Sequence, residues 1–169
     1  GLKTPTNWTE FLDCCEKLKA ANILPMVMGN KTGWCAGIMA QQGMVGEEDK
    51  DPNITYDVAA GKKSAADLYA PVLSKLKTLV DKGYVNSKES IGMEFNEEAF
   101  NGFLKGDAAF DINGTWMTGQ IDTANTGMKF QLVPMPFNDD NTKAYTFAGV
   151  IAFINAKTTH LNETKKFFD

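Results

Sequence analysis

The chain has 169 residues, 43% of them hydrophobic, so it is long enough to bury the core of one domain. Its 17 basic residues are all lysine and stand against 21 acidic ones, which gives a net charge of −4. Nucleic-acid binding depends on positive charge that neutralises phosphates and on arginine side chains that bind bases or phosphates through two hydrogen bonds. Because the chain has a negative net charge and no arginine, nucleic acid is not an expected partner. No apolar run approaches the roughly 20 residues that span a bilayer.

The first elements in chain order are predicted to be a helix, a strand and a second helix. Asn7 is placed to cap an amphipathic helix whose apolar arc includes Trp8, which predicts that Trp8 belongs to the core. The stretch "ILPMVMG" is typical of a short buried strand. The second helix is predicted to begin at a Thr32 cap and to end at Gly43.

Residues 43–63 are polar and rich in turn formers, which predicts a surface excursion with a small hairpin. Its acidic residues partly match a calcium loop, but Ile54 replaces the turn glycine and Ala60 the bidentate glutamate, so no metal site is expected. A long helix follows over 64–83. Pro71 leaves two alternatives, a helix that kinks there or one that begins just before it.

The second half of the chain continues the alternation of helices and strands. Since the order shows no internal repeat, the predicted fold class is α/β, a mixed sheet flanked by helices. The expected elements are a helix over 96–106 capped by Asn96 and ended by Gly106, a strand over 107–112, a helix over 115–125, strands over 129–136 and 146–155, and a final helix over 160–169.

Few residues suggest catalysis. The three cysteines, Cys14, Cys15 and Cys35, lack metal-ligand or redox spacing, so small core thiols are expected. His160 is the only histidine and stands at a helix start, which favours a cap or surface role. No nucleophile elbow, phosphate loop or dinucleotide fingerprint occurs. The sequence therefore predicts no catalytic residue and no cofactor, although paired carboxylates for glycoside hydrolysis stay open because their pairing is spatial.

Two tryptophans stand off the apolar faces of their helices. Trp116 points roughly 100° away from the face that carries Met117 and Ile121, and Trp34 lies about 95° from its own apolar face. Both stand in a first helical turn, where backbone N–H groups are free. An aromatic face beside free donors suits a neutral, hydroxyl-rich ligand, but another element covering each ring would explain the pattern equally well.

Several stretches, in order, carry a resemblance to a known family. They are "TPTNWTEFLDCCEKLKAANILPMV", "LVDKGYVN", "AFNGFLKGDAAFDINGTW", "FQLVPMPF" and "HLNETKKFFD". Together they resemble the extracellular solute-binding proteins of family 1, the group that includes the maltose-binding proteins. The resemblance covers nearly the whole chain, and "F..GDAAF.INGTW" is its most specific part.

The resemblance implies a two-lobed α/β protein of the periplasmic-binding type II fold that closes on its ligand. Residues 1–146 then form most of the C-terminal lobe, and residues 147–169 form a crossover strand and a helix that belong to the other lobe. It further implies an extracytoplasmic receptor, periplasmic or lipid-anchored, that delivers a sugar to an ABC transporter permease and catalyses nothing. Its partners would be a carbohydrate, the permease and the missing lobe.

The resemblance also implies the site. In the family the tryptophan of Asn-Gly-x-Trp stacks on sugar, which assigns that role to Trp116, with Asn113, Gly114 and Thr115 as the turn that presents it. Trp34 matches an aromatic position of the cleft. The stretch "GNKT" before Trp34 departs from the maltose receptors, so their specificity does not carry over.

These inferences lead to two expectations about the isolated chain. It should bind sugar weakly or not at all, because half a cleft offers half of the contacts. The strand predicted over 147–155 should fold back or pair with a second copy. The alternatives are a receptor for another solute, a glycan-active enzyme, and a protein-interaction module.

Overall fold

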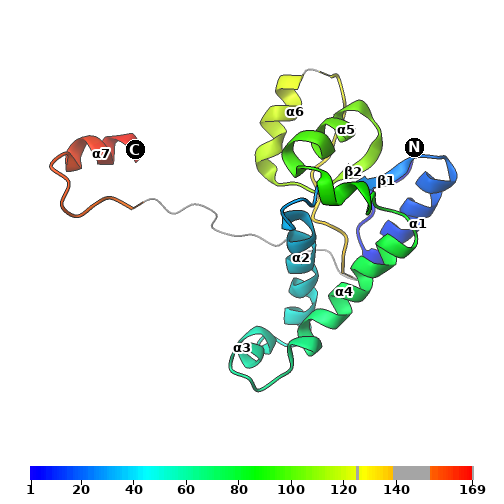
Figure 1. Ribbon diagram of the computed structural model, residues 1–169, viewed down its shortest axis with the longest axis horizontal. Helices are drawn as coiled ribbons and strands as arrows, with labels where there is room; N and C mark the ends of the chain where they lie inside the picture. Colours follow the sequence, from blue (N-terminus) through cyan, green and yellow to red (C-terminus); the bar gives the residue numbers. More distant parts are fainter. Residues whose placement is uncertain (125, 139–152, 169) are drawn as a thin grey trace.

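The computed structural model describes residues 1–124, 126–138 and 153–168. The described residues are rich in helices, which surround a small parallel sheet of two strands, and this arrangement confirms the α/β class (Figure 1). The helices are α1 (Trp8–Ala20), α2 (Trp34–Lys50), α3 (Ile54–Ala59), α4 (Ala65–Asp81), α5 (Phe100–Lys105), α6 (Thr118–Ala124) and α7 (Leu161–Phe168); the strands are β1 (Leu24–Val27) and β2 (Ala108–Asp111); the shorter turns are η1 (Glu89–Gly92), η2 (Phe95–Ala99) and η3 (Thr115–Met117).

The two strands run parallel at the centre of this part of the molecule. Leu24 pairs with Ala108 and Met26 with Phe110, while an isolated bridge joins Met26 to Val85 on the other side of β1. Helix α1 packs against β1, and α5 packs against both strands (Figure 1). The carboxyl end of β2 leads directly into η3, so the sheet places the turn that carries Trp116.

The main core lies between α1, the strands, α2 and α4. Its most deeply buried large side chains include Phe11, Met26, Met39 and Tyr84. Trp8 packs on this cluster, with its ring edge-on to Phe137 at 5.2 Å between centroids. The core role predicted for Trp8 is therefore confirmed.

All three cysteines are buried free thiols, as predicted from their spacing. Burial raises the pKa of the Cys15 thiol to about 12 and that of Cys35 to about 12. Since the thiolate is the reactive form, these groups act as small apolar side chains.

Helix α2 differs from its prediction at both ends. It begins after Gly33, whose φ is +77°, and it continues through Gly43 to Lys50. A Cβ at Gly43 would lie 2.7 Å from Val72 Cγ1 and 2.9 Å from Phe137 Cδ1. The glycine therefore allows α4 and residue 137 to approach α2 closely, and this packing outweighs its tendency to end a helix.

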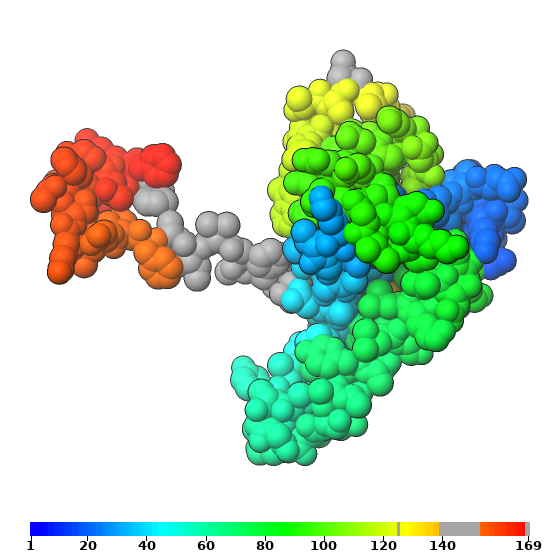
Figure 2. Space-filling model, in the orientation of Figure 1, coloured from blue at the N-terminus to red at the C-terminus, as the bar shows by residue number. Residues whose placement is uncertain are grey.

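The surface excursion predicted over residues 43–63 is wrong in its first part and in its hairpin. Residues 44–50 complete α2, and the polar stretch after them contains the short helix α3. α3 contacts α2 and α4 and forms the lower end of the view in Figure 2. The acidic residues that partly matched a calcium loop are thus spread over two helices and the turn between them.

Helix α4 begins before its proline. Ser64 caps it, with its Oγ accepting from Ala66 N–H at 3.1 Å, while the Asp67 carboxylate accepts from Ser64 N–H at 3.1 Å. Pro71 then lies inside the helix, so the alternative that starts the helix just before it is wrong. Gly83, with φ of +65°, follows the end of the helix as predicted.

The remaining predictions about the second half of the chain have different outcomes. The helical segment before β2 begins at Phe95 with a π turn, so the Asn96 cap is wrong, while Gly106 ends it with φ of +82° as predicted. Residues 129–136 form no strand, because Pro134 and Pro136 donate no ladder bonds. Residues 139–152 lie outside the described residues, and with them most of the strand predicted over 146–155; its last residues, 153–155, are described and form no strand. Helix α7 confirms the predicted final helix.

Candidate functional site

The turn after β2 presents an exposed tryptophan. Gly114 N–H donates to Asn113 Oδ1 at 3.0 Å, and Met117 N–H donates to Gly114 O at 3.1 Å. A Cβ at Gly114 would collide with the six-membered part of the Trp116 ring. Since φ of Gly114 is an ordinary −106°, glycine matters here because it leaves space for the ring in this position, and not because of its backbone conformation. The ring lies on its own turn and keeps 49% of its surface exposed.

The second tryptophan turn precedes α2. Asn30 Oδ1 accepts a hydrogen bond from Ala36 N–H at 3.1 Å, which satisfies one of the free donors of the first helical turn. Trp34 is only partly buried. One face of its ring stacks on Phe95, with centroids 4.5 Å apart and planes at 22°. The expectation of an open Trp34 face thus holds for one side of the ring at most.

The structure brings both predicted aromatic residues together. The rings of Trp34 and Trp116 lie 5.7 Å apart between centroids, tilted by 60°. With Phe95 they form a contiguous group of three rings, called the aromatic cluster below. Trp116 is its exposed member, and Trp34 lies between it and Phe95. Thr115, which was also predicted to belong to the site, is exposed beside Trp116.

Phe95 is a site residue that sequence reasoning missed. It precedes the predicted helix, so it stood outside every periodic pattern. Its position results from docking of the segment 86–95 on residues 28–31, where Lys31 N–H donates to Met93 O at 3.1 Å. A Cβ at Gly29 would lie 2.5 Å from Phe95 Cα. The glycine of "GNKT" therefore gives the backbone of Phe95 room to approach.

Asn86 anchors the same segment. Its Oδ1 accepts from Met28 N–H at 2.8 Å, and its Nδ2 donates to Met28 O at 3.2 Å. One amide side chain thus replaces a missing strand partner at the end of β1. The aromatic cluster is consequently held by backbone pairing as well as by ring contacts.

Polar groups border the aromatic cluster. Asn113 Nδ2 donates to Phe95 O at 3.4 Å and to Asp111 Oδ2 at 3.3 Å. Lys31 and Glu94 form an ion pair of 3.0 Å, and the hydrogen bond and charge of Glu94 raise the pKa of the exposed Lys31 ammonium. Hydrogen-bonding donors and acceptors thus lie next to Phe95 in the structure and next to Trp116 in the chain.

Asp111 is the one carboxylate here with a strong shift. Burial raises its pKa to about 6, against the lowering effect of hydrogen bonds from Asn113 and the backbone of Ile112. Its Oδ1 is buried and has no hydrogen-bond partner among the described residues. At neutral pH the site therefore contains a largely desolvated negative charge.

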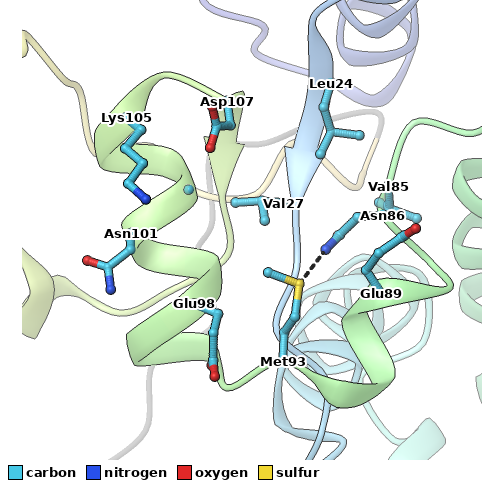
Figure 3. A pocket seen from close by; sticks show the side chains of 11 residues that line it. Leu24, Val27, Val85, Asn86, Glu89, Met93, Glu98, Asn101, Lys105 and Asp107 are labelled. Atoms are coloured by element: carbon cyan, nitrogen blue, oxygen red, sulfur yellow. Dashed lines mark hydrogen bonds between the residues drawn. The ribbon is translucent and has the colours of Figure 1, made fainter.

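A separate groove of about 720 Å³ opens beside α5 (Figure 3). Leu24 and Val27 of β1 line it together with Met93, whose sulfur accepts a 3.1 Å hydrogen bond from Asn86 Nδ2. Glu98 of η2 and Lys105 of α5 are charged side chains that border it. It shares no residue with the aromatic cluster, so the two features are distinct.

Over the part of the chain that the structure describes, no three acidic, histidine or cysteine side chains lie close enough to hold a metal ion together. His160 is exposed just before α7, consistent with the predicted cap or surface role. No helix in the described ranges combines the length and apolarity that a membrane crossing needs.

The family model of the bacterial extracellular solute-binding proteins matches residues 1–169. The chain belongs to this family. A curated relative of this solute-binding chain, an uncharacterised ABC transporter extracellular-binding protein of Pyrococcus horikoshii, is 25% identical over 165 residues, which is 96% of this chain and 36% of the relative. The family resemblance seen in the sequence is thus confirmed.

The fold of the solute-binding chain also has a solved counterpart. A sugar transporter protein of Bacillus licheniformis, crystallised with stachyose, superposes with a TM-score of 0.70 at 16% identity, over 99% of this chain and 45% of that one. This likeness supports a partial α/β lobe. The chain spans 36% of the curated relative and 45% of the solved one, so both contain substantially more chain.

Proposed function

We propose that this chain is most of one lobe of a receptor that binds a sugar or oligosaccharide in a cleft between two lobes. In this proposal it releases the sugar to an ABC transporter permease and catalyses no reaction. Family membership supports the solute-binding role, and the stachyose bound to the Bacillus neighbour supports a carbohydrate ligand. The receptor would act outside the cytoplasm, in a periplasm or on a lipid anchor.

The exposed ring of Trp116 carries this proposal. Trp116 is 49% exposed and lies against the ring of Trp34, which stacks on Phe95, so the exposed ring belongs to a contiguous aromatic group and is not an isolated apolar residue. Sugars have one face of C–H groups that stacks on an indole, and their hydroxyls match the amide and charged groups around the cluster. In the closed receptor, the opposing lobe would supply the remaining contacts.

The end of the chain supports the presence of the other lobe. Phe153 is 87% exposed and Leu161 of α7 is 44% exposed, which is the exposure expected of side chains that normally pack elsewhere. We assign residues 147–169 to the second lobe, and residues 1–146 to the lobe that carries Trp116. In the isolated chain, residues 147–155 would find a substitute partner in a second copy.

Calorimetry on the full-length receptor tests the ligand class. Neutral mono- to tetrasaccharides, stachyose included, should contain at least one that binds, while Trp116→Ala should lose most of that affinity. Gly114→Ala is the matched test of geometry, since its methyl group displaces the Trp116 ring without removing it. Asp122→Asn, an exposed residue on α6 outside the predicted site, serves as the control and should bind normally.

The rival functions predict different results in the same series. A receptor for a polyol or peptide would bind those solutes and no sugar. A glycan-active enzyme would release products from a chromogenic glycoside, and one carboxylate substitution would abolish the release. Copurification of a protein partner without any sugar binding would favour an interaction module. Micromolar sugar affinity of the isolated 169-residue chain would contradict the two-lobe site.

A further inference from the structure

Asp111 is a largely buried carboxylate, with its Oδ1 fully shielded, that the proposed sugar contacts do not use. It ends β2 directly before the turn that presents Trp116. Its Oδ2 accepts from Asn113 Nδ2 at 3.3 Å, while its Oδ1 is buried without a partner in the described part of the chain. A buried charge that is only partly hydrogen-bonded costs stability. Packing alone does not account for this residue type, because a neutral side chain of the same size would avoid the cost.

The contacts of Asn113 indicate how the Asp111 carboxylate affects the orientation of the Asn113 side-chain amide. Asn113 Oδ1 accepts from Gly114 N–H, so its Nδ2 faces two acceptors, Asp111 Oδ2 and Phe95 O. The reversed amide would place Oδ1 against those two oxygens and Nδ2 against the N–H group of Gly114. An acceptor at Asp111 therefore selects one orientation of the amide.

The orientation of the Asn113 amide affects both Trp116 and the Phe95–Trp34 pair of the aromatic cluster. Trp116 lies on the backbone of Gly114, the residue whose N–H group Asn113 holds. Phe95, whose carbonyl Asn113 also contacts, stacks on Trp34. One amide thus joins the turn of the exposed ring to the segment beneath the covered ring.

We propose that Asp111 is a positioning residue for the aromatic cluster, and that its ionised form orders the Trp116 ring through Asn113. Loss of the charge weakens one of the three hydrogen bonds that hold the amide, which loosens Gly114 and the ring above it. The biological meaning of this inference, control of sugar binding by pH, rests on the proposed function. The structural statement about Trp116 does not.

Burial and hydrogen bonds from Asn113 and Ile112, and no charged side chain, set the pKa of Asp111. Cys35 at the start of α2 feels its charge, but burial raises the pKa of that thiol to about 12, so it stays neutral. Lys31 and Glu94 pair with each other at 3.0 Å. With a pKa of about 6, Asp111 changes its charge over the range in which Trp116 is expected to respond.

Fluorine NMR on the full-length receptor labelled with 5-fluorotryptophan tests the inference without any ligand. Trp116→Phe, Trp34→Phe and Trp8→Phe assign the signals. In the wild type, the signal of Trp116 should shift and broaden as the pH falls from 7.5 to 5.0, with a midpoint near 6, while that of Trp8 stays fixed. Asp111→Asn should abolish the titration, and Asp122→Asn, an exposed carboxylate on α6, should leave it intact.

Stachyose affinity, measured over the same pH range, completes the test. We expect it to fall several-fold between pH 7.5 and 5.0 in the wild type and to be independent of pH in Asp111→Asn. A Trp116 signal that ignores pH, or that titrates equally in Asp111→Asn, would overturn the inference. If the signal titrates as expected but no sugar binds at any pH, the positioning role stands and the proposed function fails.

Discussion

The turns that carry Trp34 and Trp116 in this solute-binding chain have similar local structure, but their rings differ in how far they are covered. In each, an asparagine side chain organises the turn, a glycine precedes the tryptophan, and the ring stands off the apolar face of the helix that follows. Trp34 nevertheless has one face covered by Phe95, whereas Trp116 is 49% exposed. Helix geometry thus sets the direction of a side chain, and a segment distant in sequence decides whether anything lies in that direction.

The largest expected effect is the difference between the two rings in their contribution to the free energy of unfolding. Trp34→Ala should lower the free energy of unfolding by about 3 kcal/mol, because it removes ring contacts with both Phe95 and Trp116 and leaves a cavity. Trp116→Ala should cost less than about 1 kcal/mol, since half of that ring is already in solvent. Urea unfolding measures both; equal losses would show that the two turns do not differ.

For sugar affinity we expect the opposite order, with the larger loss at Trp116. Trp116→Ala should weaken binding of the best sugar from the calorimetric panel roughly 30-fold, or about 2 kcal/mol, as expected for a central aromatic contact. Trp34→Phe keeps a ring on Phe95 and should change affinity by less than about 3-fold. If instead Trp34→Phe loses more affinity than Trp116→Ala, Trp34 is the ring that stacks on the sugar.

Only the Trp116 turn rests on a buried carboxylate, and this gives it a pH signature. Because the folded-state pKa of Asp111 is raised to about 6, from 3.8, the folded chain holds more protons than the unfolded chain between these values. Stability should therefore decrease by about 2 kcal/mol as the pH rises from 4 to 7. Urea unfolding of Asp111→Asn should lack this decrease, whereas Asp122→Asn should retain it.

The smallest expected effect concerns the turn that carries Trp34. Asn30→Ala removes the acceptor for Ala36 N–H and should destabilise α2 by about 1 kcal/mol, a normal value for a lost helix cap. Asn30→Asp retains the acceptor and should be close to wild type. Neither substitution should alter the fluorine signal of Trp116; a shift there would show that the two turns are coupled through the rings.

Much of the fold could be predicted from local pattern. Asn7 caps α1 as its position indicated, Gly106 ends α5, and the alternation around Phe110 marks β2. These features depend on near neighbours in the chain. The prediction that the second helix ends at Gly43 was wrong, because this glycine makes room for Val72 and Phe137, which are distant in sequence. A glycine that makes room for another helix carries the same local signature as one that stops a helix.

The candidate site shows the same limit. The Asn-Gly-Thr-Trp motif and the angle of Trp116 indicated an aromatic ring off the core, and the structure exposes it. Phe95 and Asp111 gave no such signal. Phe95 precedes its helix and gains its position from pairing with residues 28–31, while Asp111 lies within a strand pattern in which it reads as an outward polar residue. Their roles depend on tertiary proximity.

The three buried thiols have a practical consequence for measuring binding. Cys14, Cys15 and Cys35 are all shielded, and burial raises the pKa of each, so a maleimide or iodoacetamide reagent would find no ready nucleophile in this chain. A single cysteine introduced at exposed Thr115 would then be the selective attachment point for an environment-sensitive dye. Placed next to Trp116, that dye would report lobe closure as a change in emission and convert the receptor into an optical sensor for its solute.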